Sequence, residues 1–412
     1  MSGHPKVRYG VEVFPVRHEG RQLILVRDQM GLDEEPLLFT PIAAALLMHM
    51  NGENSLRDLQ ELVMRKTGQL LRMQDMEDVV ALMDEHLLLE NERFYDAAAR
   101  AVARFMNDPV RRMRHAGKSY PGKADELRNL IEDFFSEKKG GPGLPETHGD
   151  GRRLLGLVAP HIDLGAGGSC YACAYKALGE SVLPKTWVIL GTGHEPVENG
   201  FALTVKDFET PLGTLACDRE FCEEFRASAP RDFLASEYNH QREHVIEFQT
   251  VFLSYFQPDA RIVPLLCSFS MEERDSDAGY IEETVALLRD IAARRGSVGF
   301  LASVDLAHIG PRYGDRSSPD SSLLIEHMAA DRGLLETLER CDSGGFMEIL
   351  LRERNRRRVC GAAPLYVFSR ALEGRALGRT LKHSYAIVGE DRSFVTFASM
   401  AFYDGDDGSS KK

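Results

Sequence analysis

The chain of 412 residues contains no apolar stretch near the roughly 20 residues that a membrane-spanning helix needs. Its first residues, MSGHPKVRYGVEVF, lack the apolar core of a signal peptide. Its seven cysteines are odd in number and scattered, which argues against a disulfide framework and favours reduced thiols. We therefore expect a cytoplasmic protein without a membrane anchor.

Positive charge is also scarce. The chain has 50 Lys and Arg against 63 Asp and Glu, a formal net charge of -13 at pH 7. This excess of negative charge disfavours binding to nucleic acids and to anionic membranes. The hydrophobic share of 43% is enough for well-packed cores, and the length predicts two or three domains.

Residues 1–108 form the first predicted domain, a winged helix. It has as many as 18 acidic residues by residue 110 against 12 basic ones, which argues against DNA recognition. The predicted elements are strands at Val11–Phe14 and Leu23–Val26, helices at Thr40–Met50 and from Ser55 and Asp75 onward, and a small wing at Leu87–Leu89 and Arg93–Tyr95. The order of these elements is similar to that of PqqD-like domains, and this resemblance implies binding of a peptide or protein.

Residues 109–412 form the second predicted domain, interrupted by a linker-like loop at 138–151 that is rich in Gly, Pro and charge. A helix is expected at Asp125–Phe135, before that loop. Strands then alternate with helices, which predicts an α/β fold with a mostly parallel sheet flanked by helices. The predicted strands are 154–159, 186–191, 261–266, 298–304 and 394–402, and the predicted helices are 168–179, 219–228, 244–256, 279–295, 320–340 and 344–352.

Polar side chains follow three of these strands. His161 comes just after the first, His194 after the second, and Asp305 and His308 after the fourth. Ligands of open α/β sheets bind outside the carboxyl ends of the strands. The three strand ends therefore predict one polar site, although each histidine taken alone would suit an exposed loop.

A second motif, His240-Gln241-Arg242-Glu243-His244, has the H-x-x-E-H order of the inverted zinc peptidases. On a helix, His240 and His244 would share a face, with Glu247 one turn further. This leaves a zinc peptidase as an alternative. The simpler interpretation is a helix start with His240 and His244 at the margin of the pocket.

Cys360 lies in the segment Arg358–Pro364, where a helix is expected to begin. A helix N-terminus lowers the pKa of a thiol, although a buried cysteine is more often a small apolar residue. The pair Cys170 and Cys173 falls inside a predicted helix and is best explained by packing. The run Arg352–Arg358 is most simply a solvated face that could attract an anionic partner.

Seven short segments follow one another in a recognisable order. They are Arg114–Pro121 (RHAGKSYP), Ala159–His161 (APH), Gly191–His194 (GTGH), Thr210–Gly213 (TPLG), Glu243–Glu247 (EHVIE), Ser303–Gly310 (SVDLAHIG) and Val359–Gly361 (VCG). Together they resemble the MEMO family, which is related in fold to the class III extradiol dioxygenases, and the resemblance extends over about residues 110–404. Prokaryotic members are called AmmeMemoRadiSam system protein B, which implies a radical SAM protein and an AMMECR-type protein as partners.

The resemblance implies a metal site formed by His161, His194 and Cys360, with Asp305 and His308 lining the same pocket in catalytic roles. Fe(II) is the expected metal, and copper or zinc are alternatives, because a thiolate in place of the dioxygenase carboxylate softens the site. The sequence departs from the family at Gly165–Ser169, where a pocket tyrosine is missing.

Three functions follow from these expectations. The first is a metal-dependent redox or oxygenase-like component. The second is a non-catalytic module that binds a peptide or small molecule, and the third is the zinc peptidase.

Overall fold

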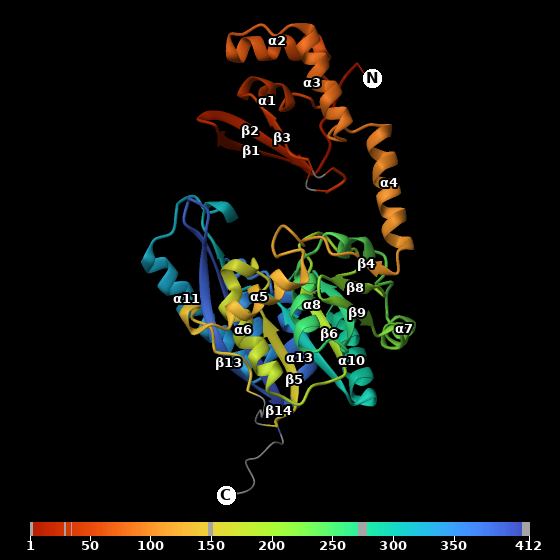
Figure 1. Ribbon diagram of the computed structural model, residues 1–412, viewed down its shortest axis with the longest axis vertical. Helices are drawn as coiled ribbons and strands as arrows, with labels where there is room; N and C mark the ends of the chain where they lie inside the picture. The colour runs from red at the N-terminus through yellow and green to blue at the C-terminus, as the bar shows by residue number, and fades with distance from the viewer. Residues whose placement is uncertain (1–2, 29, 34, 147–150, 271–277, 406–412) are drawn as a thin grey trace, which may run out of the picture. The chain divides into compact units, whose positions relative to one another are not determined.

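The computed structural model describes residues 3–28, 30–33, 35–146, 151–270 and 278–405. The chain divides into two compact units, Met1–Asp108 and Pro109–Lys412 (Figure 1). Among the described helices, none combines the length and apolar character needed to cross a membrane. The predicted loop at 138–151 falls partly outside the described residues, and its start forms the short 3-10 helix η1 (Glu137–Lys139).

The first unit combines a three-stranded antiparallel sheet, in the order β1-β2-β3, with four helices among its described residues. The first three helices contribute apolar residues to a core shared with the sheet, which includes Val26, Leu46, Leu59 and Met76. Thr40 and Ser55 cap the first two helices through their hydroxyl groups. The elements are β1 (Val11–His18), β2 (Arg21–Asp28), β3 (Leu37–Phe39), α1 (Pro41–Leu47), α2 (Leu56–Thr67), α3 (Met73–Glu85) and α4 (Glu92–Asn107).

The prediction that Arg93–Tyr95 forms the second half of a wing is wrong. Arg93–Tyr95 lies in the first turn of α4, where Asn91 caps the helix by accepting a hydrogen bond from the Phe94 amide. Helical spacing then buries Phe94, Ala101 and Phe105 on one face. The short run of aromatic and apolar residues that suggested a strand is therefore the start of an amphipathic helix.

The second unit is built on a mixed sheet in the order β12-β14-β5-β11-β6-β10-β9-β8-β4, with β13 paired to β14 and β7 paired to β10. Its centre, β5-β11-β6-β10, is parallel, and β14 runs antiparallel to β5. The predicted α/β class is thus confirmed. The strands are β4 (Val110–Arg111), β5 (Leu154–Ala159), β6 (Thr186–Thr192), β7 (Phe201–Leu203), β8 (Asp207–Thr210), β9 (Gly213–Cys217), β10 (Arg261–Cys267), β11 (Val298–Ser303), β12 (His308–Ile309), β13 (Ala376–Val388) and β14 (Ser393–Asp404).

Helices cover both faces of this sheet, which explains why every residue of the central strands β5, β6 and β11 is buried. On one face α5, α6 and α8 pack over residues such as Leu157 and Ile189, and on the other α7, α10, α11, α12 and α13 pack over residues such as Val188 and Phe300. The helices are α5 (Ala124–Phe134), α6 (Leu164–Gly179), α7 (Arg219–Ser228), α8 (Val245–Phe256), α10 (Ala278–Arg295), α11 (Ser321–Glu339), α12 (Ser343–Glu353) and α13 (Ala362–Leu372).

Candidate metal centre

The site lies where three neighbouring strands end. β5, β11 and β6 are adjacent and parallel, so the segments that follow them leave the sheet at the same edge. His161 follows β5, Asp305 follows β11, and His194 follows β6. Gln249 of α8 ties two of these ends together, because its amide donates to Pro160 O and to Ser303 Oγ, each at 2.8 Å.

His161 is fixed by the backbone. Its Nδ1 lies 3.0 Å from the Ser303 carbonyl oxygen, which can only accept, so the ring proton resides on Nδ1. Its own amide donates to Asp305 Oδ1 at 3.0 Å. The ring is buried, and burial lowers the pKa of His161 well below its usual value. A neutral ring with an unprotonated Nε2 is the form that binds metal ions.

His194 is held by a carboxylate instead. Its Nδ1 lies 3.0 and 3.1 Å from the two carboxylate oxygens of Glu243, and its backbone amide donates to the same group at 3.0 Å. The His194 side chain is 41% exposed, whereas that of Glu243 is 8% exposed. Burial opposes protonation of His194, but hydrogen bonds to Cys360 and Glu243 outweigh it and raise its pKa to about 11. Nδ1 is therefore occupied, and Nε2 is the nitrogen left for a metal.

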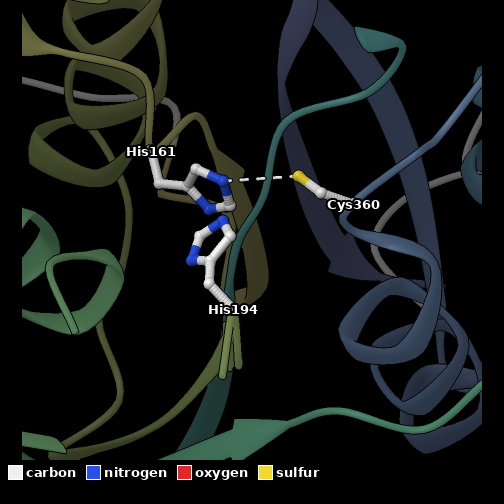
Figure 2. A group of neighbouring side chains, drawn as sticks. All are labelled: His161, His194 and Cys360. Carbon is white, nitrogen blue, oxygen red and sulfur yellow. Dashed lines mark hydrogen bonds between the residues drawn. The ribbon is translucent and has the colours of Figure 1, made fainter. Parts of the chain in front are cut away.

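Cys360 completes the group, although it lies much later in the sequence than the two histidines. It lies just before α13, and its Sγ is 3.4 Å from His161 Nε2 (Figure 2). Burial raises the pKa of the Cys360 thiol, and the hydrogen bond to His194 only partly opposes this. The expectation that a helix N-terminus lowers the pKa of this thiol is thus wrong for the metal-free protein, because the loss of water around the sulfur is the larger effect.

The three donor atoms fit one metal ion. Nitrogens of His161 and His194 and the sulfur of Cys360 all lie within 4.8 Å of one another. For a tetrahedral ion with bonds of about 2.0–2.3 Å, a nitrogen and a sulfur would be separated by about 3.6 Å, close to the distance found between His161 and Cys360. Two imidazoles and one thiolate would leave coordination positions open for another molecule.

Asp305 and His308 lie beside this group but differ in their surroundings. Asp305 is buried, its Oδ2 is 3.7 Å from His161 Nε2, and burial raises its pKa to about 7. His308 belongs to β12 and donates from Nδ1 to the Leu306 carbonyl oxygen at 3.1 Å, while its ring packs edge-on against Tyr313. Burial lowers the pKa of His308, so its ring is neutral near pH 7.

The H-x-x-E-H motif does not lie on one helical face. His240 is in the 3-10 helix η2 (Glu237–Gln241), whereas α8 begins only at Val245. His240 is buried and donates from Nε2 to the Ala202 carbonyl oxygen at 2.9 Å. Glu247 forms a buried ion pair with Arg111. The zinc peptidase interpretation is therefore wrong, because two of its three residues are engaged elsewhere.

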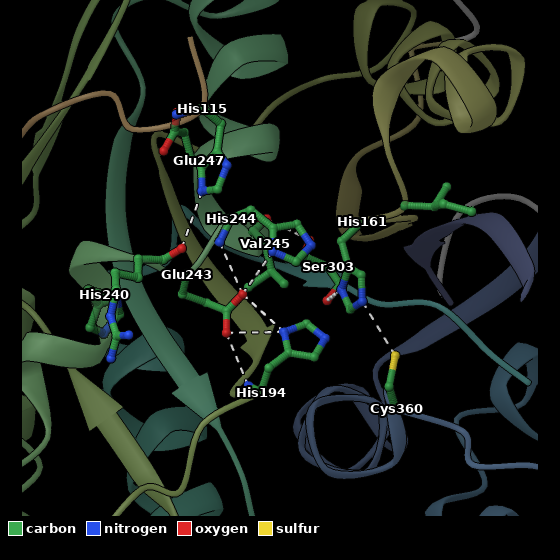
Figure 3. Close-up of polar contacts among 12 residues, drawn as sticks. His115, His161, His194, His240, Glu243, His244, Val245, Glu247, Ser303 and Cys360 are labelled. Carbon is green, nitrogen blue, oxygen red and sulfur yellow. Dashed lines mark hydrogen bonds and ion pairs between the residues drawn. The ribbon is translucent and has the colours of Figure 1, made fainter. Parts of the chain in front are cut away.

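His244 and Glu243 from the same motif belong to the site. The His244 ring is stacked on His194 with centroids 5.3 Å apart, and it lies 5.4 Å from the His161 ring. Glu243 bonds both His194 and His244, and these three residues form a second group with metal-ligating geometry (Figure 3). The sequence placed His244 at the margin and gave Glu243 no role beyond the peptidase motif.

A cavity of about 520 Å³ reaches the cysteine. Its wall combines polar and apolar residues, and it includes Thr192 and Gly193, which directly precede His194. Such a volume suits a small organic molecule. The sequence could not locate it, because its lining comes from segments far apart in the chain: Thr192, Gly193, Pro196, Val197, Cys267–Ser270, Leu350, Leu351, Arg354, Asn355, Val359, Cys360, Ala362 and Ala363.

Comparison with known proteins places the chain in a family. Residues 111–401 match the family model described as Memo-like protein. The chain belongs to this Memo-like family. Its fold and the presence of the three donor residues agree with the resemblance read from the sequence.

Curated relatives carry the same family name. A MEMO1 family protein of Aquifex aeolicus is 29% identical over 401 residues, which cover 97% of this chain and all of that one. Such an alignment has to include most of the first unit as well. A MEMO1 family protein of Methanopyrus kandleri is 31% identical and covers 70% of this chain and 98% of its own length. A solved structure of an uncharacterized Escherichia coli K12 protein is 14% identical, covers 60% of this chain and 99% of its own, and has a TM-score of 0.31, too low to support a conclusion.

Proposed function

We propose that this Memo-like protein binds a transition metal ion through His161, His194 and Cys360. The observation that carries the proposal is the orientation of the two rings: each has Nδ1 held by a protein acceptor, so that Nε2 is the nitrogen available to a metal beside the Cys360 thiol. Metal-bound histidines in proteins are commonly oriented by such a hydrogen bond from the other ring nitrogen. A chance cluster of three polar side chains would not need this arrangement.

The donor set favours particular metals. Imidazole suits iron, copper and zinc, and a thiolate shifts the preference toward softer ions. Fe(II) is the first candidate, with copper and zinc as alternatives. A bound iron or copper ion would supply one-electron redox chemistry and open coordination positions.

The other residues of the site support a redox or oxygenase-like role. Asp305 has a pKa of about 7 because it is buried, so it can hold or release a proton at neutral pH. His308 is a second candidate for handling a proton or contacting a substrate. The adjacent cavity would hold a small organic molecule next to Cys360.

Anaerobic Fe(II) titration tests this proposal. The wild type should bind one Fe(II) per chain, and Cys360→Ser should lose at least about 100-fold in affinity, because a neutral hydroxyl replaces a thiolate. Cys173→Ser is the matched control, since Cys173 is a free cysteine in α6 and is not part of the metal-ligating group. Equal and negligible binding by the wild type and Cys360→Ser would overturn the proposal, as would equal affinity in both.

We also propose that the first unit docks a companion peptide or protein. β1 is an edge strand, and it exposes Val13 and Phe14. An exposed sheet edge can pair with a further extended segment. The family resemblance suggests a radical SAM protein and an AMMECR-type protein as partners.

Co-purification of the full-length chain with these two proteins tests the docking proposal. Val13→Lys should weaken the complex, because a lysine on an edge strand opposes strand addition. Met48→Lys makes the same kind of change at an exposed residue after α1 and should retain binding. Failure of the wild type to bind either companion, or equal binding by both variants, would contradict it.

A further inference from the structure

A second cavity, of about 450 Å³, lies in the Memo-like unit between α11 and the end of α12. It does not share any lining residue with the cavity that reaches Cys360. Its wall is rich in nitrogen donors, because it includes Arg316, Arg356, Arg357 and His327. The proposed metal site gives these residues no role.

A tight turn within the arginine-rich run Arg352–Arg358 directs its side chains toward two different cavities. After α12 ends, Arg354, Asn355 and Arg358 all have positive φ, at 51°, 42° and 49°. Such values are unfavourable for residues other than glycine and persist only where the surrounding structure fixes them. The Asn355 side chain fixes this turn by accepting from the Val359 amide at 2.9 Å. As a result, Arg354 lines the cavity beside Cys360, whereas Arg356 and Arg357 line the second cavity.

Arg357 is the buried member of the second cavity. Only 4% of the residue is exposed, its Nε donates to Glu353 at 2.8 Å, and its Nη1 pairs with Asp331. Within the part of the chain that the structure describes, Nη2 has no hydrogen-bond acceptor, and His327 Nδ1, which donates when it carries the ring proton, has no hydrogen-bond partner either. Buried donors without a partner are costly and rare, which points to a missing acceptor near this wall.

The charges leave two cations available. Asp315 is engaged by Arg358 and by the Gly310 amide, and Glu353 is engaged by Arg357. Glu326 is the remaining acidic residue of the wall. Arg316 and Arg356 are exposed at the cavity, and no ion pair is found for either among the described residues. The wall therefore offers more free positive than negative charge.

We propose that the second cavity binds an oxyanion of the phosphate type. A tetrahedral anion offers several acceptor oxygens, and guanidinium groups bind such oxygens in pairs with favourable geometry. Arg316 and Arg356 would hold the anion at the mouth, and the spare donors of Arg357 and His327 would receive it deeper in the wall. Free phosphate and the phosphate group of a small metabolite share this chemistry.

Thermal unfolding of the full-length protein with added anion tests the proposal. Inorganic phosphate, glycerol 3-phosphate and chloride would be compared at equal ionic strength, with metal-loaded and with chelator-treated protein. Phosphate should raise the melting temperature saturably in both forms, because the cavity is separate from the metal ligands. A larger shift with glycerol 3-phosphate would identify a phosphomonoester as the preferred source, and a larger shift with phosphate would identify the free ion.

Two double variants with the same change of charge decide the location. Arg316→Gln/Arg356→Gln removes the two cations of the cavity, and we expect at least a tenfold loss of phosphate affinity. Arg332→Gln/Arg352→Gln removes two exposed cations from α11 and α12, the helices beside the cavity, at positions outside its lining, and this variant should bind like the wild type. The proposal is overturned if phosphate acts no more strongly than chloride, if the shift requires the metal, or if both double variants lose affinity equally.

Discussion

His161 and His194 supply the same donor atom to the proposed metal site, but the protein holds them in opposite ways. His161 is buried, its Nδ1 is fixed by a backbone carbonyl, and its pKa is low because of burial. His194 is partly exposed, its Nδ1 is fixed by the Glu243 carboxylate, and its pKa is raised to about 11. One ring is ready for a metal, and the other first has to lose a proton.

This difference shows that the group that orients a histidine ring also decides whether the ring is in the neutral form that binds a metal. A backbone carbonyl directs a ring without adding a full negative charge, so the neutral state remains favoured. A carboxylate directs the ring equally well but also stabilises the protonated state. The same negative charge would stabilise a bound metal cation, so Glu243 makes metal binding by His194 dependent on pH.

The largest expected effect comes from removing the two rings in turn. At pH 7 we expect His161→Ala to weaken Fe(II) binding by at least about 100-fold and His194→Ala by roughly tenfold, because protons compete for His194 but not for His161. An anaerobic competition titration against a coloured chelator measures both. The difference between the affinity losses of the two variants should become smaller toward pH 9, because protons compete less strongly for His194 there. Equal losses at both pH values would contradict the comparison.

A smaller effect is expected from Glu243→Gln. Without the carboxylate, the pKa of His194 should fall toward its ordinary value, so binding above neutral pH should release about one proton fewer. The slope of affinity against pH between 7 and 9 should therefore fall by about one factor of ten per pH unit. Glu195→Gln, next to His194 but paired with Arg242, is the control and should leave the pH dependence unchanged. An unchanged slope in Glu243→Gln would contradict the assigned role.

The smallest effect on metal binding is expected from His240→Leu. This change leaves the Ala202 carbonyl oxygen without its donor, and we expect a loss of about 1–3 kcal/mol in the free energy of unfolding. Urea denaturation measures this loss, and Fe(II) affinity should stay as in the wild type. A large loss of metal affinity with unchanged stability would show that His240 contributes to metal binding after all.

Continuous apolar runs made the central sheet predictable. β5, β6, β10 and β11 are buried on both faces, and each was predicted within about one residue of its observed ends. β13 was missed because it has no such run and only its first residue is buried. α13 was anticipated only as a helix start, and its Pro364 is tolerated because it lies in the first turn.

The site was predictable only in part. The strand ends indicated His161, His194, Asp305 and His308, and the family resemblance added Cys360. The anchoring of the rings was not predictable, because the Ser303 carbonyl is a backbone group and Glu243 lies in a motif whose spacing suggested a helix. Because the chain breaks between η2 and α8, the side chain of His240 lies in the core and that of His244 lies against the His161 and His194 rings. Residue spacing alone could not show that break.

The strained turn before Cys360 has a consequence for local motion. The segment from Arg354 to Cys360 is held by Asn355, by Arg358 and, if a metal is bound, by the cysteine sulfur. A bound ion would act as a cross-link between this segment and the ends of β5 and β6, which lie much earlier in the chain. Metal loss would then speed amide hydrogen exchange in this turn before it altered the rest of the sheet.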